Sequence, residues 1–451
     1  MFYFTTNGSA AGRDLPVGDF FCERLQTFLT PLLFFLDQLL DRRLVNTFAG
    51  LCESLIRLRS RATGLYLSEL GSYLLSPAQA PAGTKRISNL LRSSKWQEQH
   101  LINYLALQAQ VYAQQLQHLK KELVLLLWDE SVQEKAESLQ SEGLCAVRSS
   151  KAQRLLRIKK GYYEPPTRKP VHVPGLRWVG LLLAGLQQPP QLARFRWWSS
   201  RQPQFTSLAP VRLELLNWAR ELFGRTVLHV FDRGYASKEW LGLLLNQQDR
   251  LLLRWPSAYK LLDGQGRLKR ASLFSVGRRA TSSQKVWDLV GKCQVKRSLL
   301  WQRCWHVAYQ DCPLTLIICR PGKAGRQPWY LLTNEKVETD KQAWQLVHAY
   351  ARRWQIEQSF RFSKSELAME SCRLWFWENK MKLLQIVALV YAFLLTLLAK
   401  ELQPHIQTLL RAGCHRTGKR ARNTPNPLYR IRLALANLFN QLNLNNIQSS
   451  G

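Results

Sequence analysis

Apolar and polar positions divide the chain into parts with different periodicities. In residues 1–120 apolar residues recur at helical spacing, most clearly in segments 25–40 and 101–119. From Lys121 they form short runs separated by turns, which predicts β-strands. These runs cover residues 123–128, 178–186, 193–198 and 226–231, with a helical pattern at 211–223. Strands and a helix in this order predict an α/β fold.

The second half of the chain again changes from strands to helices. Residues 241–335 alternate short apolar runs with turns, which predicts a β-rich insertion. A long helix is expected to begin at Thr339, because Thr339 and Gln342 have the spacing of a capping box. The apolar run 383–399 is just short of a membrane-spanning length, so we expect a helix buried in a core or a dimer interface. The Asn- and Gln-rich tail is predicted to be unstructured.

The charge of the chain points to a polyanionic partner. There are 64 Lys and Arg residues against 31 Asp and Glu, a formal net charge of +33. Such a surplus repels itself in a compact protein and is most often tolerated when the partner is a polyanion. A short basic helix at 84–92, with Lys85 and Arg86 on its outer side, suits contact with a DNA backbone. A second basic group is either a DNA contact or a solvated face; it comprises Lys151, Arg154, Arg157, Lys159 and Lys160.

Cysteine spacing and the beginning of the chain exclude other classes. The nine cysteines form no Cys-x-x-Cys pair, which argues against a zinc module and favours reduced thiols in the cytosol. The first residues lack a basic region followed by an apolar stretch, so we expect no signal peptide.

Two of the scarce acids follow predicted buried strands. Asp129 comes after the run 123–128, and Asp232 comes after the run 226–231. A carboxylate at a strand end faces the crevice beyond the sheet, although Asp is also favoured there by turn chemistry alone. Glu130 is expected to point to the opposite face from Asp129, because strand side chains alternate. His229, inside the second strand, is interpreted as a packed histidine.

A third acid lies on the predicted long helix. Tyr350, Arg353, Glu357 and Lys364 fall within about 60° of one helix face at roughly 100° per residue. A solvated charged face is the usual explanation of such a stripe, but it rarely carries a Tyr and one acid between two bases. The arrangement places one carboxylate beside groups that can hold phosphate oxygens.

Together the three acids suit metal-dependent chemistry at phosphorus. Asp129, Asp232 and Glu357 offer the hard oxygen ligands that Mg²⁺ takes, and two such ions can stabilise both oxygens of an in-line displacement. No Gly-rich phosphate loop is present as an alternative route to phosphate chemistry.

These residues resemble the Asp-Asp-Glu transposases of bacterial insertion sequences. The spacing Tyr-x2-Arg-x3-Glu-x6-Lys, from Tyr350 to Lys364, is similar to the signature of one subgroup. The segments Phe231–Tyr235 and Trp329–Glu335 are similar to two further blocks of that subgroup. The resemblance covers about residues 121–398 and implies a ribonuclease-H-like catalytic core interrupted by a β-rich insertion.

The resemblance also implies a function and roles for residues. The expected activity is DNA cleavage at transposon ends and joining to target DNA, with two Mg²⁺ ions for which Mn²⁺ can substitute, and with a hairpin as an optional intermediate. Tyr350, Arg353 and Lys364 are expected to grip a phosphate of the transposon end. Trp329 is expected to stack on a flipped base, with ordinary strand packing as the alternative and Trp301 and Trp305 as substitutes.

The implied organisation has five parts and three possible functions. The parts are a helical DNA-binding region (1–120), the first part of the core (121–240), the β-rich insertion (241–335), the catalytic helix (336–370) and a helical, dimerising region (371–451). The expected partners are double-stranded DNA, in terminal inverted repeats and target, and a second copy of the chain, in the bacterial cytoplasm without a membrane. The alternatives are a ribonuclease-H-like nuclease without strand transfer and a non-catalytic DNA-binding relative.

Overall fold

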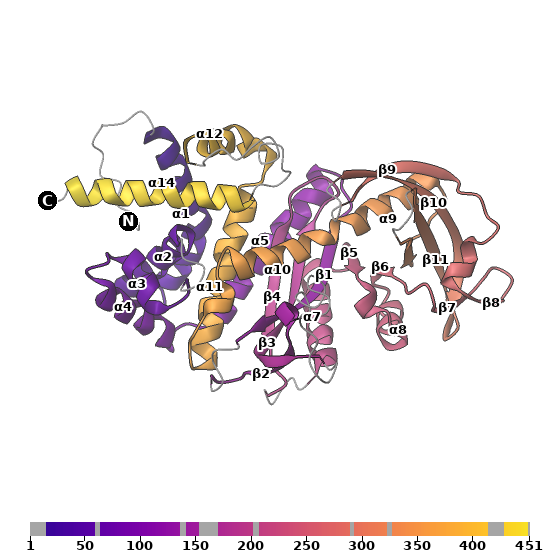
Figure 1. The fold of residues 1–451 in the computed structure, drawn as a ribbon, viewed down its shortest axis with the longest axis horizontal. Helices are drawn as coiled ribbons and strands as arrows, with labels where there is room; N and C mark the ends of the chain where they lie inside the picture. Colours follow the sequence, from indigo (N-terminus) through magenta and orange to yellow (C-terminus); the bar gives the residue numbers. More distant parts are fainter. Residues whose placement is uncertain are drawn as a thin grey trace.

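The computed structural model is a mixed α/β molecule built around a long twisted sheet (Figure 1). The described residues are 15–58, 64–135, 141–152, 170–201, 207–288, 293–322, 327–413 and 428–449. A helical layer covers one end of the molecule, and the sheet extends away from it.

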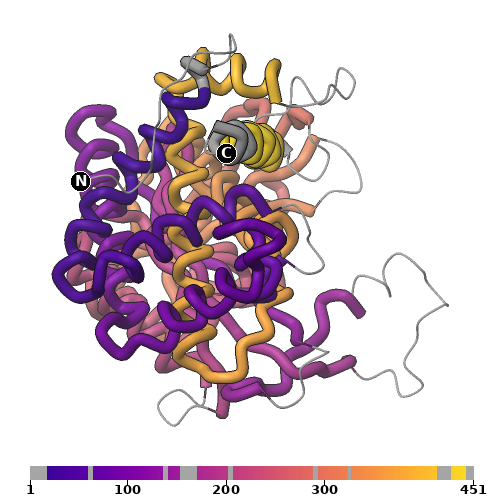
Figure 2. The backbone as a smooth tube through the Cα atoms, turned by 90° about the vertical axis from the view of Figure 1, so that its left-hand side faces the viewer, coloured from indigo at the N-terminus to yellow at the C-terminus, as the bar shows by residue number. Residues whose placement is uncertain are grey.

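The N-terminal region is helical, as predicted. Its helices are α1 (Leu15–Asp37), α2 (Arg42–Arg57), α3 (Leu67–Leu74), α4 (Ala80–Arg92) and α5 (Glu98–Gln114), which ends in the π-helical turn η1 (Gln115–Leu119). The Asp41 side chain caps α2 by accepting the backbone N–H of Leu44. Figure 2 shows these helices in front of α11 (Trp377–Thr396).

The first strands form one half of the sheet. They are β1 (Leu125–Glu134), β2 (Cys145–Arg148), β3 (His172–Ala184), β4 (Gln191–Trp198), β5 (Leu228–Phe231) and β6 (Arg250–Arg254). β1 pairs antiparallel with β3 and parallel with β5, and β5 pairs parallel with β6. β3 also pairs antiparallel with both β2 and β4.

The β-rich region continues the same sheet. β12 (Trp329–Thr333) pairs with β6, and β11 (Tyr309–Pro321) joins β12 to β10 (Cys293–His306). β7 (Lys260–Leu262) and β9 (Ser282–Asp288) also pair with β10, and β8 (Leu268–Arg270) pairs with β7. Within the described ranges the sheet therefore has 12 strands.

Helices cover both faces of the sheet, and the alternation of β1 shows which side chains meet them. Leu126 and Trp128 belong to the core that contains α7 (Leu208–Phe223) and α8 (Lys238–Asn246). Leu125 and Leu127 belong to the other core, with α9 (Asp340–Arg352), α10 (Trp354–Ser365) and α11. α9 and α10 lie nearly in line and run toward α11 (Figure 1).

α11 is a core helix. It is the one helix in the described part of the chain that is long and apolar enough to span a membrane, and 89% of its apolar window is buried inside the protein. It contacts α2, α5 and β4, between the helical layer and the sheet. The core alternative predicted for residues 383–399 is therefore confirmed, and this surface is occupied within the chain.

The end of the chain differs from its prediction. After α12 (Gln403–Gly413), α14 (Leu428–Ser449) is a helix that includes the Asn- and Gln-rich tail, so the prediction of an unstructured tail was wrong. Its apolar residues Ile431, Leu435 and Phe439 are buried, and α14 packs on α2 and α12. Burial of this stripe stabilises the first half of α14, and the helix continues from there into the tail.

Candidate active site

Asp129 and Asp232 lie on neighbouring parallel strands. Asp232 directly follows β5, as predicted. Asp129 lies in the middle of β1, so the prediction that this strand ends at Trp128 was wrong. The pairing of β1 with β5 stops at Leu127, but its pairing with β3 continues to Glu134, and this keeps the strand extended.

Glu130 faces away from Asp129, as strand alternation predicted. Its carboxylate accepts a hydrogen bond from Arg212 Nε at 2.7 Å, on the side of the sheet covered by α7. Asp129 Oδ2 lies 3.5 Å from Arg353 Nη1 on the opposite side. Asp129 is therefore the β1 carboxylate that faces the signature residues.

The signature helix is two helices joined at Arg353, where the sequence predicted one. The backbone N–H of Arg353 donates to Tyr350 O at 3.0 Å, and that of Ile356 donates to Arg353 O at 3.1 Å. These tighter hydrogen bonds replace the ordinary α-helical ones and mark the junction of α9 and α10. The capping box of Thr339 and Gln342 is present at the start of α9, as predicted.

Two of the three acids contact the Arg353 guanidinium, and the third is bound by Tyr350. Arg353 is only 8% exposed and donates to Asp129 and to Glu357 on its own helix. The Tyr350 hydroxyl, one turn earlier, donates to Asp232 Oδ1 at 3.1 Å. The structure thus gathers these residues from β1, β5, α9 and α10.

Burial and neighbouring charges shift the pKa values of the two aspartates in the site. Burial raises the pKa of Asp129 to about 7 against the opposing effect of Arg353, and the charges of Glu357 and Asp232 raise it further. Burial also acts to raise the pKa of Asp232, but Arg353, the Tyr350 hydroxyl and backbone hydrogen bonding hold it below its usual value. Asp129 and Asp232 therefore ionise together only beside positive charge.

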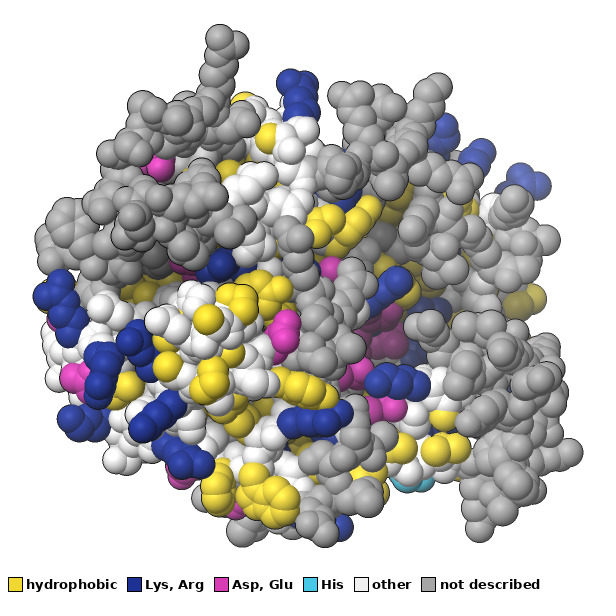
Figure 3. Space-filling model, turned by 60° about the vertical axis from the view of Figure 1, so that its left-hand side comes forward, with side chains coloured by type: hydrophobic (Ala, Val, Ile, Leu, Met, Phe, Trp, Pro, Cys, Tyr) yellow, Lys and Arg dark blue, Asp and Glu magenta, His cyan; other side chains and the backbone are white. Residues whose placement is uncertain are grey.

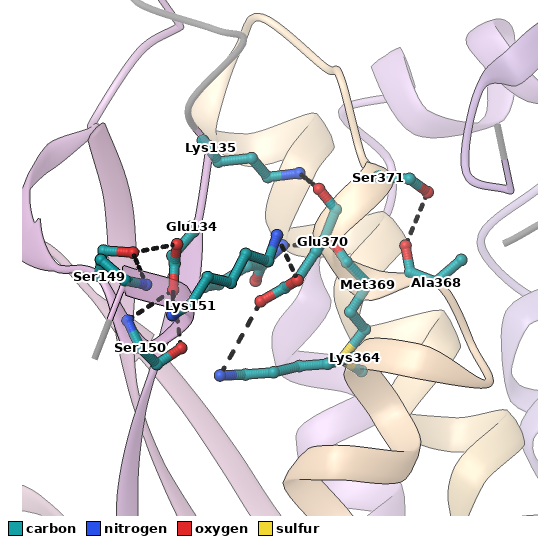
Figure 4. Close-up of polar contacts among 12 residues, drawn as sticks. Glu134, Lys135, Ser149, Ser150, Lys151, Lys364, Ala368, Met369, Glu370 and Ser371 are labelled. Carbon is teal, nitrogen blue, oxygen red and sulfur yellow. Dashed lines mark hydrogen bonds and ion pairs between the residues drawn. The ribbon is translucent and has the colours of Figure 1, made fainter. Parts of the chain in front are cut away.

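Lys364 reaches the same face of β1 from the end of α10. Its Nζ donates to Ser131 Oγ at 2.9 Å, two residues beyond Asp129. Glu370 lies on its other side, 4.0 Å away (Figure 4). Burial lowers the pKa of the Lys364 ammonium.

Trp329 lies beside the site on β12. Its ring meets that of Tyr350 edge-on, with 5.2 Å between the centroids, and the Arg297 guanidinium lies 4.1 Å from its centroid. Of the substitutes for Trp329, Trp301 donates from Nε1 to Asp340 Oδ1 at 2.8 Å, and Trp305 pairs across to Leu262 within the sheet extension.

Arg254 and Arg297 are site neighbours that sequence reasoning missed. Arg254 Nη1 donates to the Tyr350 hydroxyl at 3.4 Å from the last residue of β6. Its place at the end of an apolar strand next to β5 is the same signal that identified Asp232. No comparable signal marks Arg297, which reaches Trp329 only through the pairing of distant strands.

The other predicted groups lie away from the carboxylates or were interpreted correctly as packing. Lys85 and Arg86 are exposed on α4, in the helical layer. Lys151 is exposed, whereas Arg154, Arg157, Lys159 and Lys160 lie outside the described residues. His229 is fully enclosed and accepts a hydrogen bond from Trp128 Nε1 at 3.1 Å, so it is a packed histidine.

The three carboxylates are of the chemical type that binds a divalent metal ion. Three carboxylates supply hard oxygen ligands, and their mutual repulsion calls for a cation. The Arg353 guanidinium meets that need in this arrangement. Across the part of the chain that the structure describes, no three Asp, Glu, His or Cys side chains lie close enough together to enclose a metal ion.

Sequence comparison agrees with the geometry. The family model described as "Transposase DDE domain" matches this chain from residue 209 to residue 393. The segment resembles a transposase domain. This DDE-domain match contains Asp232 and Glu357 and extends into α11, whereas Asp129 precedes it.

No curated protein matches the sequence. One similar solved structure is the cryo-EM structure of the piggyBac transposase synaptic complex with hairpin DNA, with 12% identity and a TM-score of 0.40. The alignment covers 90% of this chain and 73% of that one.

Proposed function

We propose that the chain is a DNA transposase that cleaves transposon ends and joins them to target DNA. The observation that carries the proposal is the gathering of Asp129, Asp232 and Glu357 around Arg353, with two of the three acids inside the DDE-domain match. The placement of the acids on adjacent parallel strands and on a helix packed against them supports a ribonuclease-H-like core.

The proposed chemistry is in-line displacement at phosphorus, without a covalent protein intermediate. Asp129, Asp232 and Glu357 would hold two divalent ions, Mg²⁺ or in its place Mn²⁺, which supply Lewis-acid charge on the attacking and leaving oxygens. Arg353 and Lys364 then neutralise phosphate oxygens, and the Tyr350 hydroxyl donates to one of them. Arg254 adds a further guanidinium on the Tyr350 side of the site.

Trp329 is the proposed support for an unpaired base at the transposon end. Its contact with Tyr350 supports this role, because Tyr350 also binds Asp232. An indole face offsets part of the cost of unstacking a base. A base held there suits cleavage through a hairpin intermediate.

The remaining basic surface is proposed to steer DNA. Lys and Arg side chains are spread over the face seen in Figure 3. Lys85 and Arg86 on α4 and Lys151 beside β2 are the exposed groups assigned here to phosphate contact. The proposed functional unit is a homodimer that joins two transposon ends, acting on the nucleoid in a bacterial cytoplasm.

A cleavage and joining assay tests the function. The purified protein is mixed with a duplex that carries the inverted repeats flanking its coding region, together with a target plasmid. We expect strand breaks at the repeat boundary and joined products with Mg²⁺ or Mn²⁺, and none with a chelator. Breaks without joining would indicate the nuclease alternative, and binding without breaks would indicate a non-catalytic protein.

A further inference from the structure

The chain reverses direction directly after α10. Ala368 adopts a left-handed backbone conformation with φ 53° and ψ 30°, which is uncommon for a residue other than Gly, Asn or Asp. The short helix η4 (Met369–Ser371) follows and returns the chain toward β1. The reversal places Glu370 beside Lys364, six residues earlier in the sequence.

Side chains from the end of β1 hold this reversal in place. Gln133 Nε2 donates to Met369 O, and Lys135 Nζ donates to the carbonyl oxygens of Glu370 and Cys372. Both donors are buried. A strained turn persists only when its surroundings fix it, and strain of this kind is concentrated at functional sites.

The Glu370 carboxylate lies between two ammonium groups (Figure 4). Its Oε2 is 3.1 Å from Lys151 Nζ, and its Oε1 is 4.0 Å from Lys364 Nζ. The Lys151 side chain is 65% exposed and that of Lys364 is 16% exposed, so the cluster opens to solvent on the Lys151 side.

Hydrogen bonds to β1 also hold the Lys364 side chain and the backbone of Lys151. Ser131 accepts from Lys364 Nζ. Glu134 accepts from the backbone N–H groups of Ser150 and Lys151 at 2.7 and 3.1 Å, and this anchors the start of the second basic group. The Lys364 ammonium and the backbone of Lys151 are therefore held on the strand that carries Asp129.

We propose that Glu370 occupies the place of a DNA phosphate between Lys151 and Lys364 and is displaced when DNA binds. A carboxylate offers two anionic oxygens, as a phosphodiester does, and both pair with ammonium groups. Glu370 thereby acts as a specificity-determining residue. It competes with any duplex for two of the cations, so that this strongly basic chain holds non-cognate DNA less tightly. The inference rests on the proposed function, because it needs Lys364 to bind DNA phosphate.

The test compares Glu370→Gln with Glu221→Gln in binding to a non-cognate duplex. Glu221 is exposed on α7, on the opposite face of the sheet, and its substitution removes the same charge. We expect Glu370→Gln to tighten binding about threefold or more near 0.1 M salt, and to steepen the log K against log salt slope by about 0.9 for each phosphate newly neutralised. Glu221→Gln should change neither quantity.

A purely structural role for Glu370 predicts the opposite. It predicts a lower melting temperature with no gain in affinity and no steeper slope, and that result would overturn the inference. If Glu370→Gln does not fold, Glu370→Asp keeps the charge on a shorter side chain, and it should show a smaller gain in affinity in the same direction.

DNA binding by the unaltered protein separates a failure of the proposed function from a failure of the role of Glu370. If the unaltered protein binds duplex DNA without salt dependence, the proposed function fails and the inference fails with it. If the unaltered protein shows the expected salt dependence but Glu370→Gln and Glu221→Gln behave alike, only the role of Glu370 is overturned.

Discussion

Arg353 sets the charge balance among the site residues. Its nearly buried guanidinium donates to Asp129 and Glu357. Burial of this charged group without these partners would be costly. The surrounding anionic groups outweigh burial and raise the pKa of Arg353 above its usual value. Arg353 is therefore the group through which the carboxylates tolerate one another in this arrangement.

His229 gives a prediction for acid stability. Burial lowers its pKa from 6.5 to about 4, so the folded protein resists protonation that the unfolded chain accepts. Its contribution is complete above pH 6.5 and is lost as the pH falls toward 4. As the pH falls from 6.5 to 4, the free energy of unfolding should drop in both proteins. We expect the drop to be about 2–3 kcal/mol smaller in His229→Asn than in the unaltered protein. Denaturant unfolding across that range measures the difference, and parallel curves would contradict this account of His229.

Among the single residues of the site, the sequence predicted those that lie close together along one helix. Tyr350, Arg353, Glu357 and Lys364 share one helical stripe. In the structure three of them bind Asp232, Asp129 or Ser131, and Glu357 binds Arg353. Arg297 and Glu370 were not predicted. They reach the site through strand pairing and a turn, and neither is encoded by a local repeat.

Close approach of α10 to β3 positions Glu357. Gly180 pairs with Asp129 across the sheet, and a Cβ at this position would lie 2.6 Å from Phe360 Cε1 and 2.9 Å from Ile356 Cδ1. Phe360 is held against Trp178, with 4.6 Å between the ring centroids, so it has little room to shift. Glycine at position 180 therefore lets α10, which carries Glu357, lie close to the strand that pairs with Asp129.

We expect Gly180→Ala to lower the free energy of unfolding by about 1–3 kcal/mol through overpacking. DNA cleavage should fall further than this stability loss explains, because α10 is pushed away from β1. The control is Gly264→Ala, where a Cβ meets nothing within 4 Å. Chemical denaturation and cleavage rates test the pair, and a Gly180→Ala protein with full activity would remove this role of the glycine.

Element types were predicted better than element ends. The strands β1, β3, β4 and β5 and the helix α7 all appear where the apolar pattern placed them. β1 was predicted too short because pairing with β3, rather than apolar character, sustains its second half. The junction at Arg353 leaves no mark in the helical stripe, since the residue keeps helical backbone angles.

At the scale of the molecule, α11 connects the helical layer to the sheet. Leu389 is fully buried at its centre. We expect Leu389→Ala to lower the free energy of unfolding by about 2–5 kcal/mol without changing the oligomeric state. Denaturant unfolding and light scattering distinguish the outcomes. Dissociation of an oligomer with unchanged stability would instead place α11 at a subunit interface.

The charge of +33 predicts the salt response of the whole chain. If Lys and Arg neutralise phosphates, log K for duplex DNA should fall linearly with log salt, with a slope of about −0.9 for each phosphate contacted. Fluorescence anisotropy with a labelled duplex measures the slope. A slope near zero would contradict phosphate contact as the source of affinity.

Asp129, Asp232 and Glu357 are proposed to act together in DNA cleavage. The most direct measurement is the cleavage rate of Asp129→Asn, Asp232→Asn and Glu357→Gln on a transposon-end duplex with Mg²⁺, beside the exposed control Glu338→Gln. Each of the three variants should lose about a thousandfold or more in rate, because several kcal/mol of transition-state stabilisation is removed. All four proteins should still bind the duplex. Cleavage at the unaltered rate by any of the three site variants, with binding intact, would contradict the account.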